Sequence, residues 1–263
     1  MKKSISLILL MIVLLCGFPG KIYSQDASVD VSEDGISIYS SIIDPILKKR
    51  QHVVALPDDG FYLEISNSAF KKSTEIVIKK RKEILYQLPE NFVALSDFWE
   101  YDIVGKNEYD KKTAILFRLD SAKSDYLKKI IFWNGKSWQE LPSKIVDIES
   151  GKVEAKAYLP FLRFLVVADM TKISQGQASW YRYKSCLCAA SPDYPKGSIL
   201  RVTNIENSKS VEVKVNDFGP DRSVHPDRVI DLDLVAFGKI AKKGAGLVSV
   251  LVEPIKVNTK NKL

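Results

Sequence analysis

The sequence is poor in the residues that build metal centres. Its 263 residues include three cysteines and two histidines. A closed four-ligand metal site needs clustered cysteine and histidine ligands, which this chain does not offer. Cys186 and Cys188 stand two apart and would face the same side of a strand, but a bridge between them would close a small, strained ring. The pair is expected to be two half-buried thiols or a labile disulfide, and no metal or cofactor is expected.

The sequence also lacks the marks of nucleic-acid binders and of helical proteins. It contains no dense stripe of Lys and Arg with interleaved aromatics, and no long amphipathic helix pattern. The formal net charge is +7, and removing the first 24 residues, with three lysines and no acids, leaves 36 basic and 32 acidic residues, or +4. This mild positive charge suits an anionic wall polymer and predicts no nucleic-acid partner.

The first 24 residues have the layout of a secretory signal peptide. A positive start and an apolar run over 5–18 lead to small or polar residues up to Ser24, where cleavage is expected. The run is shorter than the about 20 residues that a spanning helix needs, so removal is favoured over a retained anchor. Cys16 follows Leu15, and lipoprotein sites carry a small residue there, which argues against lipidation. The sequence predicts a secreted, envelope-associated protein that meets the membrane only through this leader.

Residues 36–168 predict a β-sandwich domain. Apolar and polar residues alternate over 61–65 and 75–79, which is the period of half-buried strands. Asn134-Gly135 between apolar runs predicts a two-residue hairpin turn, because both turn residues must accept positive φ. Many short strands at regular spacing are typical of a sandwich. Residues 169–177 are polar, contain Gly176 and predict a linker.

Three segments of this region, 59–70, 95–103 and 132–141, resemble immunoglobulin-like or ZU5-like sandwich modules. The three tryptophans there are candidates for glycan platforms, with packing in the core or across strands as the alternative. They are Trp99, Trp133 and Trp138. The region contains no catalytic constellation, so a spacer or docking role is expected.

Four motifs follow in order in the C-terminal third. They are ASWY at 178–181, AAS…PKGS…RVTN within 189–204, VKVNDFGP at 213–220 and RVIDLD at 228–233. Together they resemble the double-psi β-barrel of the rare lipoprotein A family of lytic transglycosylases, with expansins as distant relatives. The resemblance implies a six-stranded barrel over 178–257 with a substrate groove across one face. The expected fold class is therefore all-β, a sandwich followed by a barrel.

Asp217 is the expected catalytic residue, because the Asp of the family's NDxGP motif lies in that groove. It ends an alternating strand and enters a turn, where function often sits, although a cap of the turn is the structural alternative. The resemblance implies that a sugar hydroxyl attacks to give an anhydro-sugar, so a single carboxyl can donate a proton and later accept one. A donor near neutral pH needs a pKa raised by burial or by a neighbouring carboxylate. Phe218 is a candidate for an apolar side chain that buries the Asp217 carboxyl. The candidates for a neighbouring carboxylate are Asp221, Asp227 and Asp231.

Eight further residues are expected to contact the glycan. The aromatic rings among them would stack on pyranose faces, and the alternative for these rings is packing in the barrel core. They are Trp180, Tyr181, Tyr183, Ser191, Tyr194, Asn216, Phe218 and His225. Arg228 and Asp231 are predicted to form a structural salt bridge.

The chain departs from the family pattern at three of these motif positions. Ser191 stands where histidine is common, Phe218 where arginine is usual, and Arg182 where glycine is. His225, in a loop beside the same turn, either substitutes for the missing histidine in space or is a solvated bystander.

The sequence thus predicts a peptidoglycan lytic transglycosylase with Asp217 as general acid and base. A non-catalytic glycan-binding or expansin-like wall-loosening module is the alternative, and an extracellular adhesion protein led by the sandwich is the third. Ser191 favours the second hypothesis, and the retained Asp217 favours the first.

Overall fold

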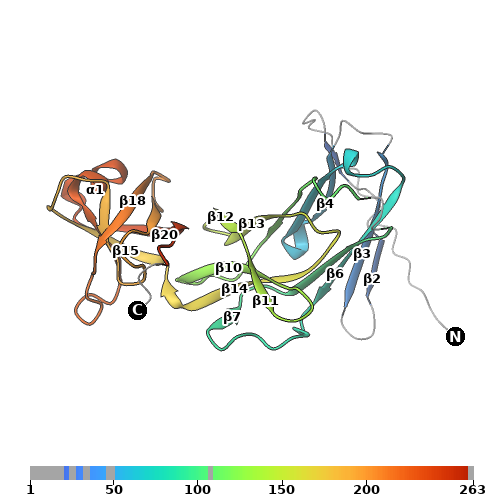
Figure 1. Ribbon diagram of the computed structural model, residues 1–263, viewed down its shortest axis with the longest axis horizontal. Coiled ribbons are helices and arrows are strands. Elements are labelled where there is room, and N and C mark those ends of the chain that lie inside the picture. The colour runs from blue at the N-terminus through green and yellow to red at the C-terminus, as the bar shows by residue number, and fades with distance from the viewer. Residues whose placement is uncertain (1–20, 24–27, 32–35, 46–50, 106–108, 260–263) are drawn as a thin grey trace.

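The computed structural model describes residues 21–23, 28–31, 36–45, 51–105 and 109–259. Residues 1–20, with Cys16 and most of the predicted leader, lie outside this part. Within it, no helix has the length and apolar character needed to cross a membrane. The described chain is all-β, as predicted from the sequence, and its strands form two open sheets and one closed barrel (Figure 1).

The two open sheets are built from the N-terminal two thirds of the chain. The first has the order β1 (Lys21–Tyr23), β4 (Gln51–Leu56), β5 (Phe61–Ser66), β9 (Ile115–Leu119), β13 (Lys152–Ala157) and β12 (Ser143–Asp147). The second has the order β11 (Trp138–Leu141), β10 (Tyr126–Trp133), β14 (Phe161–Ile173), β8 (Phe98–Ile103), β6 (Thr74–Arg81), β3 (Ser37–Ile43) and β2 (Ser28–Val31), and β7 (Phe92–Ala94) pairs with β14.

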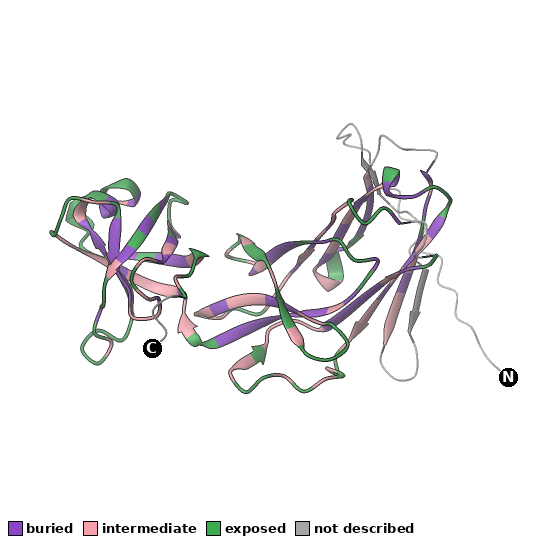
Figure 2. Ribbon diagram, viewed as in Figure 1, coloured by how far each residue is buried: buried purple, intermediate pink, exposed green. Residues whose placement is uncertain are grey.

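Alternating residues of the two sheets share one core. Along β5 every second residue is buried, and the same holds for the apolar part of β6, since successive strand residues face opposite sides. Trp99 is 2% exposed and stacks on Phe61 with ring centroids 4.4 Å apart, so it is a core residue and not a glycan platform. Burying a side chain such as Phe61 contributes about 1.5–3 kcal/mol. Buried residues run along the strands of both sheets in Figure 2.

The other two tryptophans pack beneath the 82–91 segment on the outside of the second sheet. Trp133 stacks on Tyr86 with ring centroids 4.3 Å apart, and the indole N–H of Trp138 donates to the carbonyl of Gln87 at 2.9 Å. Both tryptophans are half-buried. Packing across the strands therefore accounts for the positions of these rings.

The hairpin between β10 and β11 turns one residue later than predicted. Trp133 pairs with Trp138, and the Asn134 N–H donates to the Ser137 carbonyl at 3.2 Å, so Gly135 and Lys136 form the tight loop. The side-chain oxygen of Asn134 accepts from the N–H groups of Lys136 and Ser137, both at 2.9 Å. This Asx-turn requires the asparagine before the loop and explains the shift.

The segment expected as a linker, 169–177, is extended and hydrogen-bonded. β14 runs to Ile173 and β15 (Gln175–Tyr181) begins two residues later, so only Ser174 lies between the strands. The N–H groups of Ser174 and Gln175 donate to the carbonyl of Asp125 at 2.7 and 2.9 Å. The connection between the two parts of the molecule is thus short and is fixed by hydrogen bonds at the end of β14 and the start of β15 (Figure 1).

The C-terminal part is a closed six-stranded barrel. Its strand order is β15, β19 (Arg228–Asp233), β16 (Cys188–Ala190), β18 (Ser210–Asp217), β17 (Ile199–Asn204) and β20 (Val248–Lys256), with the helix α1 (Leu234–Ile240) after β19. Two of the pairings, β15 with β19 and β16 with β18, are parallel. The barrel interior is filled by a separate core of small and branched residues around Phe237.

A close backbone approach at the start of the barrel leaves no room for a side chain at Gly176. A Cβ there would lie 2.6 Å from the Asp227 carbonyl oxygen and 2.7 Å from Val229 Cγ1. We expect Gly176→Ala to lower the free energy of unfolding by about 1–3 kcal/mol, because backbone must shift to accept it. Gly238→Ala in the exposed face of α1 meets nothing within 4 Å and should instead stabilise by about 0.4–1 kcal/mol. Urea denaturation of both variants measures the difference, and equal midpoints would contradict it.

Candidate functional site

Asp217 ends β18 in a row of residues that crosses four barrel strands. The strand registers pair Ser179 with Asp231, Asp231 with Ala190, and Ala190 with Asp217. The chain then turns back over this row, since a Cβ at Gly219 would lie 3.7 Å from both Ala190 Cβ and Asp231 Oδ2. The turn therefore brings Asp217 and Asp231 to the same end of the barrel.

Asp217 is exposed and paired with a cation. Its side chain is 56% exposed, and its Oδ1 accepts from Lys196 Nζ at 3.1 Å and from the Phe218 N–H at 3.0 Å. These two hydrogen bonds and the lysine charge hold the pKa of Asp217 below its ordinary value. The expectation of a raised pKa is therefore wrong for this arrangement, because the carboxylate is solvated and its nearest charge is positive.

Aromatic side chains form a rim beside Asp217. Tyr181 is half-buried and its hydroxyl donates to the side-chain oxygen of Asn216 at 3.4 Å. Burial, followed by the charge of Asp217, raises the pKa of Tyr181 to about 12. Tyr183, with its ring 6.3 Å from that of Tyr181, and Phe218 are 59% and 73% exposed. These exposed rings beside a carboxylate suit stacking on a sugar.

Ser191 lies beneath the site. It is 2% exposed, its N–H donates to the Asp217 carbonyl at 3.1 Å, and its hydroxyl accepts from the N–H groups of Asp193 and Tyr194 at 3.3 and 3.2 Å. The side chain shapes the turn after β16 and presents no polar atom to a ligand. The described contacts of Ser191 thus place no group at this position that could act beside Asp217 as a histidine would.

Replacing Ser191 therefore tests a structural role. We expect Ser191→Ala to lower the free energy of unfolding by about 1–2 kcal/mol, because two turn N–H groups lose their acceptor. Glycan affinity should stay within about twofold, since a change below 0.5 kcal/mol is typical away from a contact. Thermal unfolding and glycan titration of the variant provide the two measurements. A large loss of affinity at unchanged stability would instead indicate direct contact.

Two of the predicted stacking residues serve the barrel itself. Trp180 packs against the barrel core with its ring 6.5 Å from that of Phe237, and its indole N–H donates to the Lys243 carbonyl at 3.2 Å. Tyr194 is 4% exposed within the same core. Among the predicted rings, Tyr181 and Phe218 remain beside Asp217, and Tyr183 lies next to Tyr181.

His225 and Arg228 lie toward the opposite end of the barrel. β19 runs parallel to β15, so Arg228 is level with Gln177, and the Asp227 carbonyl accepts from the Gln177 N–H at 2.8 Å. Asp231, three residues further along β19, is about 10 Å away at the usual strand rise. The exposed His225 therefore does not replace the missing histidine, and the described contacts join Asp231 to the hydroxyl of Ser179 and not to Arg228.

A different arginine, Arg222, holds the loop that follows Asp217. Its guanidinium donates two hydrogen bonds to the carboxylate of Asp193, at 2.9 and 2.5 Å, and its Nε donates to the Arg228 carbonyl. A bidentate pair of this kind fixes both position and orientation. It ties the loop after Asp217 to the turn that contains Ser191. No sequence pattern distinguishes Arg222 from its neighbouring arginines.

Asp233 organises the aromatic rim from below. It is 1% exposed, its Oδ1 caps α1 by accepting from the Val235 N–H at 3.0 Å, and its Oδ2 accepts from the N–H groups of Tyr183, Lys184 and Ser185, each at 3.2 Å. Burial alone would raise the pKa of Asp233, but the four N–H donors outweigh it and lower the pKa. Its place before a helix is an N-cap signal that the sequence shows.

Cys186 and Cys188 form a disulfide in the same loop, with Cα atoms 5.3 Å apart. In the described ranges, the two sulfur atoms and a carboxylate oxygen of Asp233 form a cluster of potential metal ligands, all within 4.8 Å of one another. The two sulfurs are bonded to each other and the carboxylate accepts four N–H groups. These atoms therefore serve to hold the loop and offer no set of ligands to a metal.

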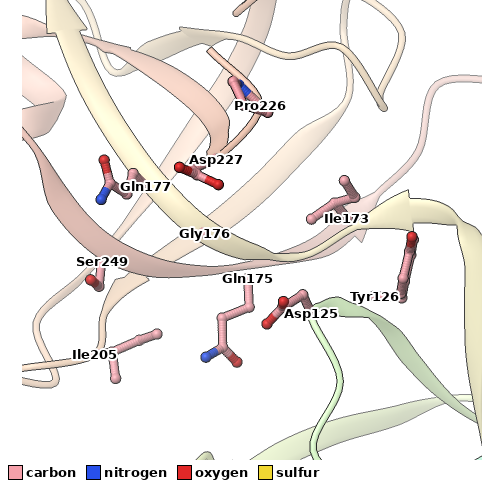
Figure 3. Close-up of a pocket in the computed structure, with 10 residues that line it drawn as sticks. All are labelled: Asp125, Tyr126, Ile173, Gln175, Gly176, Gln177, Ile205, Pro226, Asp227 and Ser249. Carbon is pink, nitrogen blue, oxygen red and sulfur yellow. The ribbon is translucent and has the colours of Figure 1, made fainter. Parts of the chain in front are cut away.

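A separate polar pocket of about 290 Å³ lies where the barrel meets the N-terminal sheets (Figure 3). Asp125 and Tyr126 line it from β10 and the preceding loop, and Gln175, Gln177 and Asp227 line it from the barrel. Asp217 is not among its lining residues. The glycan-site hypothesis therefore rests on the open barrel end and not on this pocket.

Comparison with known proteins shows that the barrel is similar to a family of known domains. Residues 173–252 match the family model described as lytic transglycolase. The endolytic peptidoglycan transglycosylase RlpA of Neisseria meningitidis serogroup A is 37% identical over 120 residues, which cover 40% of this chain and 47% of that protein. The RlpA proteins of Vibrio cholerae and Campylobacter jejuni are 37% and 30% identical over 101 and 123 residues, covering 33% and 41% of this chain and 37% and 42% of those proteins.

The chain thus spans less than half the length of these relatives. Its C-terminal part is an RlpA-like double-psi β-barrel, as the four motifs predicted. The immunoglobulin-like or ZU5-like character of the N-terminal sheets stays a prediction.

Proposed function

We propose that this protein is a lytic transglycosylase of peptidoglycan with Asp217 as its general acid and base. The observation that carries the proposal is the position of Asp217 at the end of β18 in an RlpA-like barrel, beside the exposed rings of Tyr183 and Phe218. The relatives that share this barrel are named as endolytic peptidoglycan transglycosylases. Action on the wall implies association with the cell envelope, and the leader predicted over residues 1–24 supplies the route of export.

The reaction needs one carboxyl group that takes part in two proton transfers, first giving a proton and then accepting another. The Asp217 carboxyl donates a proton to the glycosidic oxygen as the bond to the sugar breaks, and its carboxylate then accepts the proton of the attacking sugar hydroxyl. The product is an anhydro-sugar, and water takes no part. Oδ2 of Asp217 is the atom for this transfer, since Oδ1 accepts from Lys196 and Phe218, and none of the contacts among the described residues reaches Oδ2.

The other groups position the sugar. Tyr183 and Phe218 offer flat faces to pyranose rings, and Tyr181 and Asn216 offer polar atoms beside Asp217. We assign Asp231 a supporting role, since its carboxylate lies under Gly219 and is bonded to Ser179. The N-terminal sheets, which we propose as a sandwich domain over 36–168, act as a spacer or docking module for the barrel at 178–257.

A non-catalytic glycan-binding or wall-loosening module is the second candidate. Two observations favour it: the Ser191 hydroxyl is buried in a turn, and the pKa of Asp217 is lowered. A binding module would need the exposed rings and not the proton transfer.

Digestion of purified peptidoglycan separates the two candidates. The enzyme should release anhydro-muropeptides that mass spectrometry identifies by the loss of water relative to hydrolysis products. Retention of the protein on sedimented peptidoglycan without any released fragments would reject the enzyme and support the binding module.

A further inference from the structure

Lys196 is the cation of the Asp217 site, and the sequence motifs gave it no role. Its ammonium lies 3.1 Å from Asp217 Oδ1 while 60% of its side chain is exposed. Of its three N–H donors one is engaged by Asp217, and the described contacts show no other partner for the ammonium. The remaining donors therefore face solvent at the entrance to the site.

The backbone that carries Lys196 is fixed, although its side chain is not. The Gly197 N–H donates to the Val215 carbonyl at 2.7 Å, and the Asn258 side chain donates to the Lys196 carbonyl at 2.8 Å. The Ser198 N–H closes the turn onto Pro195 at 3.1 Å. Because the lysine stem is long and rotatable, its ammonium can move over several ångströms while the turn stays in place.

The ion pair itself is weak. Both side chains are more than half exposed, and water screens a pair of this kind strongly. A second carboxylate that reached the ammonium would therefore compete readily with Asp217. Such a group, held beside Asp217, would also disfavour the charge on Asp217.

The neighbourhood suits an acidic sugar. The titratable groups that face Asp217 are Lys196 from the turn before β17 and Tyr181 from β15, while Asp231 on β19 lies under the turn at Gly219. The cation of Lys184 lies 5.0 Å from the Tyr183 ring centroid, so the aromatic rim is itself flanked by positive charge. A pyranose on the rim would place an acidic substituent within reach of these ammonium groups.

We propose that Lys196 exchanges partners when an acidic glycan binds, leaving Asp217 for a carboxylate of the glycan so that Asp217 takes up a proton. This inference rests on the proposed function and names Lys196 as the positioning residue that selects carboxylate-bearing glycans. The ammonium and the glycan carboxylate keep their charges, and one proton passes from the buffer to Asp217. That proton goes to the leaving glycosidic oxygen, and the attacking hydroxyl returns one.

The test counts protons during binding. Soluble glycan chains from purified peptidoglycan, which carry carboxylates, are titrated calorimetrically into the protein in two buffers of different ionisation enthalpy. N-acetylglucosamine oligomers of equal length provide the neutral comparison. At about pH 5, close to the ordinary pKa range of an aspartate, we expect uptake of a fraction of a proton per complex with the acidic chains and none with the neutral oligomers.

Variants show whether Lys196 is responsible. Lys196→Met should weaken binding of the acidic chains by roughly threefold to tenfold, leave binding of neutral oligomers unchanged and abolish the uptake. Lys196→Arg should restore affinity, and Lys209→Met, before the far end of β18, should behave as wild type. Asp217→Asn should bind without proton uptake.

Two outcomes would overturn the proposal. One is equal affinity of Lys196→Met and wild type for acidic chains, and the other is binding of acidic chains by wild type without proton uptake. Neither depends on cleavage. Proton uptake without release of anhydro-muropeptides would reject the enzyme and leave the exchange intact, whereas cleavage without uptake would reject the exchange alone.

Discussion

Asp217→Asn should lower the rate of anhydro-muropeptide release by at least about 100-fold, because a positioned acid and base typically contributes that much or more. The amide keeps the shape of the carboxylate but transfers no proton. The side chain is exposed, so the variant should fold and melt like the wild type. Mass spectrometry of timed digests measures the rate, and sedimentation with peptidoglycan measures binding, which should persist.

Asp221→Asn is the matched control for this experiment. Asp221 is an exposed carboxylate in the loop that follows Asp217, and its Oδ1 accepts from the N–H and hydroxyl of Ser223. Among the described interactions, Asp221 makes no contact with the row of residues that contains Asp217. Asp221→Asn should therefore release anhydro-muropeptides at the wild-type rate. If Asp217→Asn digested peptidoglycan as fast as this control, the acid and base role would be wrong.

Asp233→Ala should cause the largest loss of stability among substitutions at the barrel end, about 3–5 kcal/mol. Loss of a helix N-cap costs about 1 kcal/mol, and the three bonds to the exposed loop 183–185 contribute less than the roughly 1.5–3 kcal/mol of a fully buried bond to a charged group, because water can replace the acceptor. Four N–H groups, on α1 and on the loop 183–185, would lose their acceptor together. Since domains are stable by only about 5–15 kcal/mol, the barrel would be close to unfolding at 37 °C. Urea denaturation, monitored by the intrinsic fluorescence of the barrel, measures the loss in the free energy of unfolding.

The pH dependence of stability has a definite sign for Asp233. Its pKa is lowered in the folded chain, so its contribution is present above the unfolded value near pH 3.9 and is lost as the pH falls through the folded value. Asp233→Ala should therefore make the free energy of unfolding fall less steeply as the pH is lowered on the acid side of the stability curve (the acid limb). Asp227→Ala, at an exposed position toward the other end of β19, should change neither stability nor this limb. Parallel acid limbs for wild type and Asp233→Ala would contradict the role of the four N–H groups.

The sequence alone determined the strands and the family of the barrel. Alternation located β5, β6 and β18, because each strand presents every second residue to a core and the signal is local. The order of four motifs predicted the double-psi barrel, since all of its strands derive from one short segment.

Tertiary structure decided the composition of the site. Lys196 meets Asp217, and Ser179 meets Asp231, through pairings between strands that are distant in sequence. His225 follows Asp217 by only eight residues, yet the parallel course of β19 along β15 carries it toward the far end of the barrel. Ser191 and Tyr194 are buried because the turn after β16 folds inward. Local pattern fixes which residues can be strands, but barrel closure decides which side chains become neighbours.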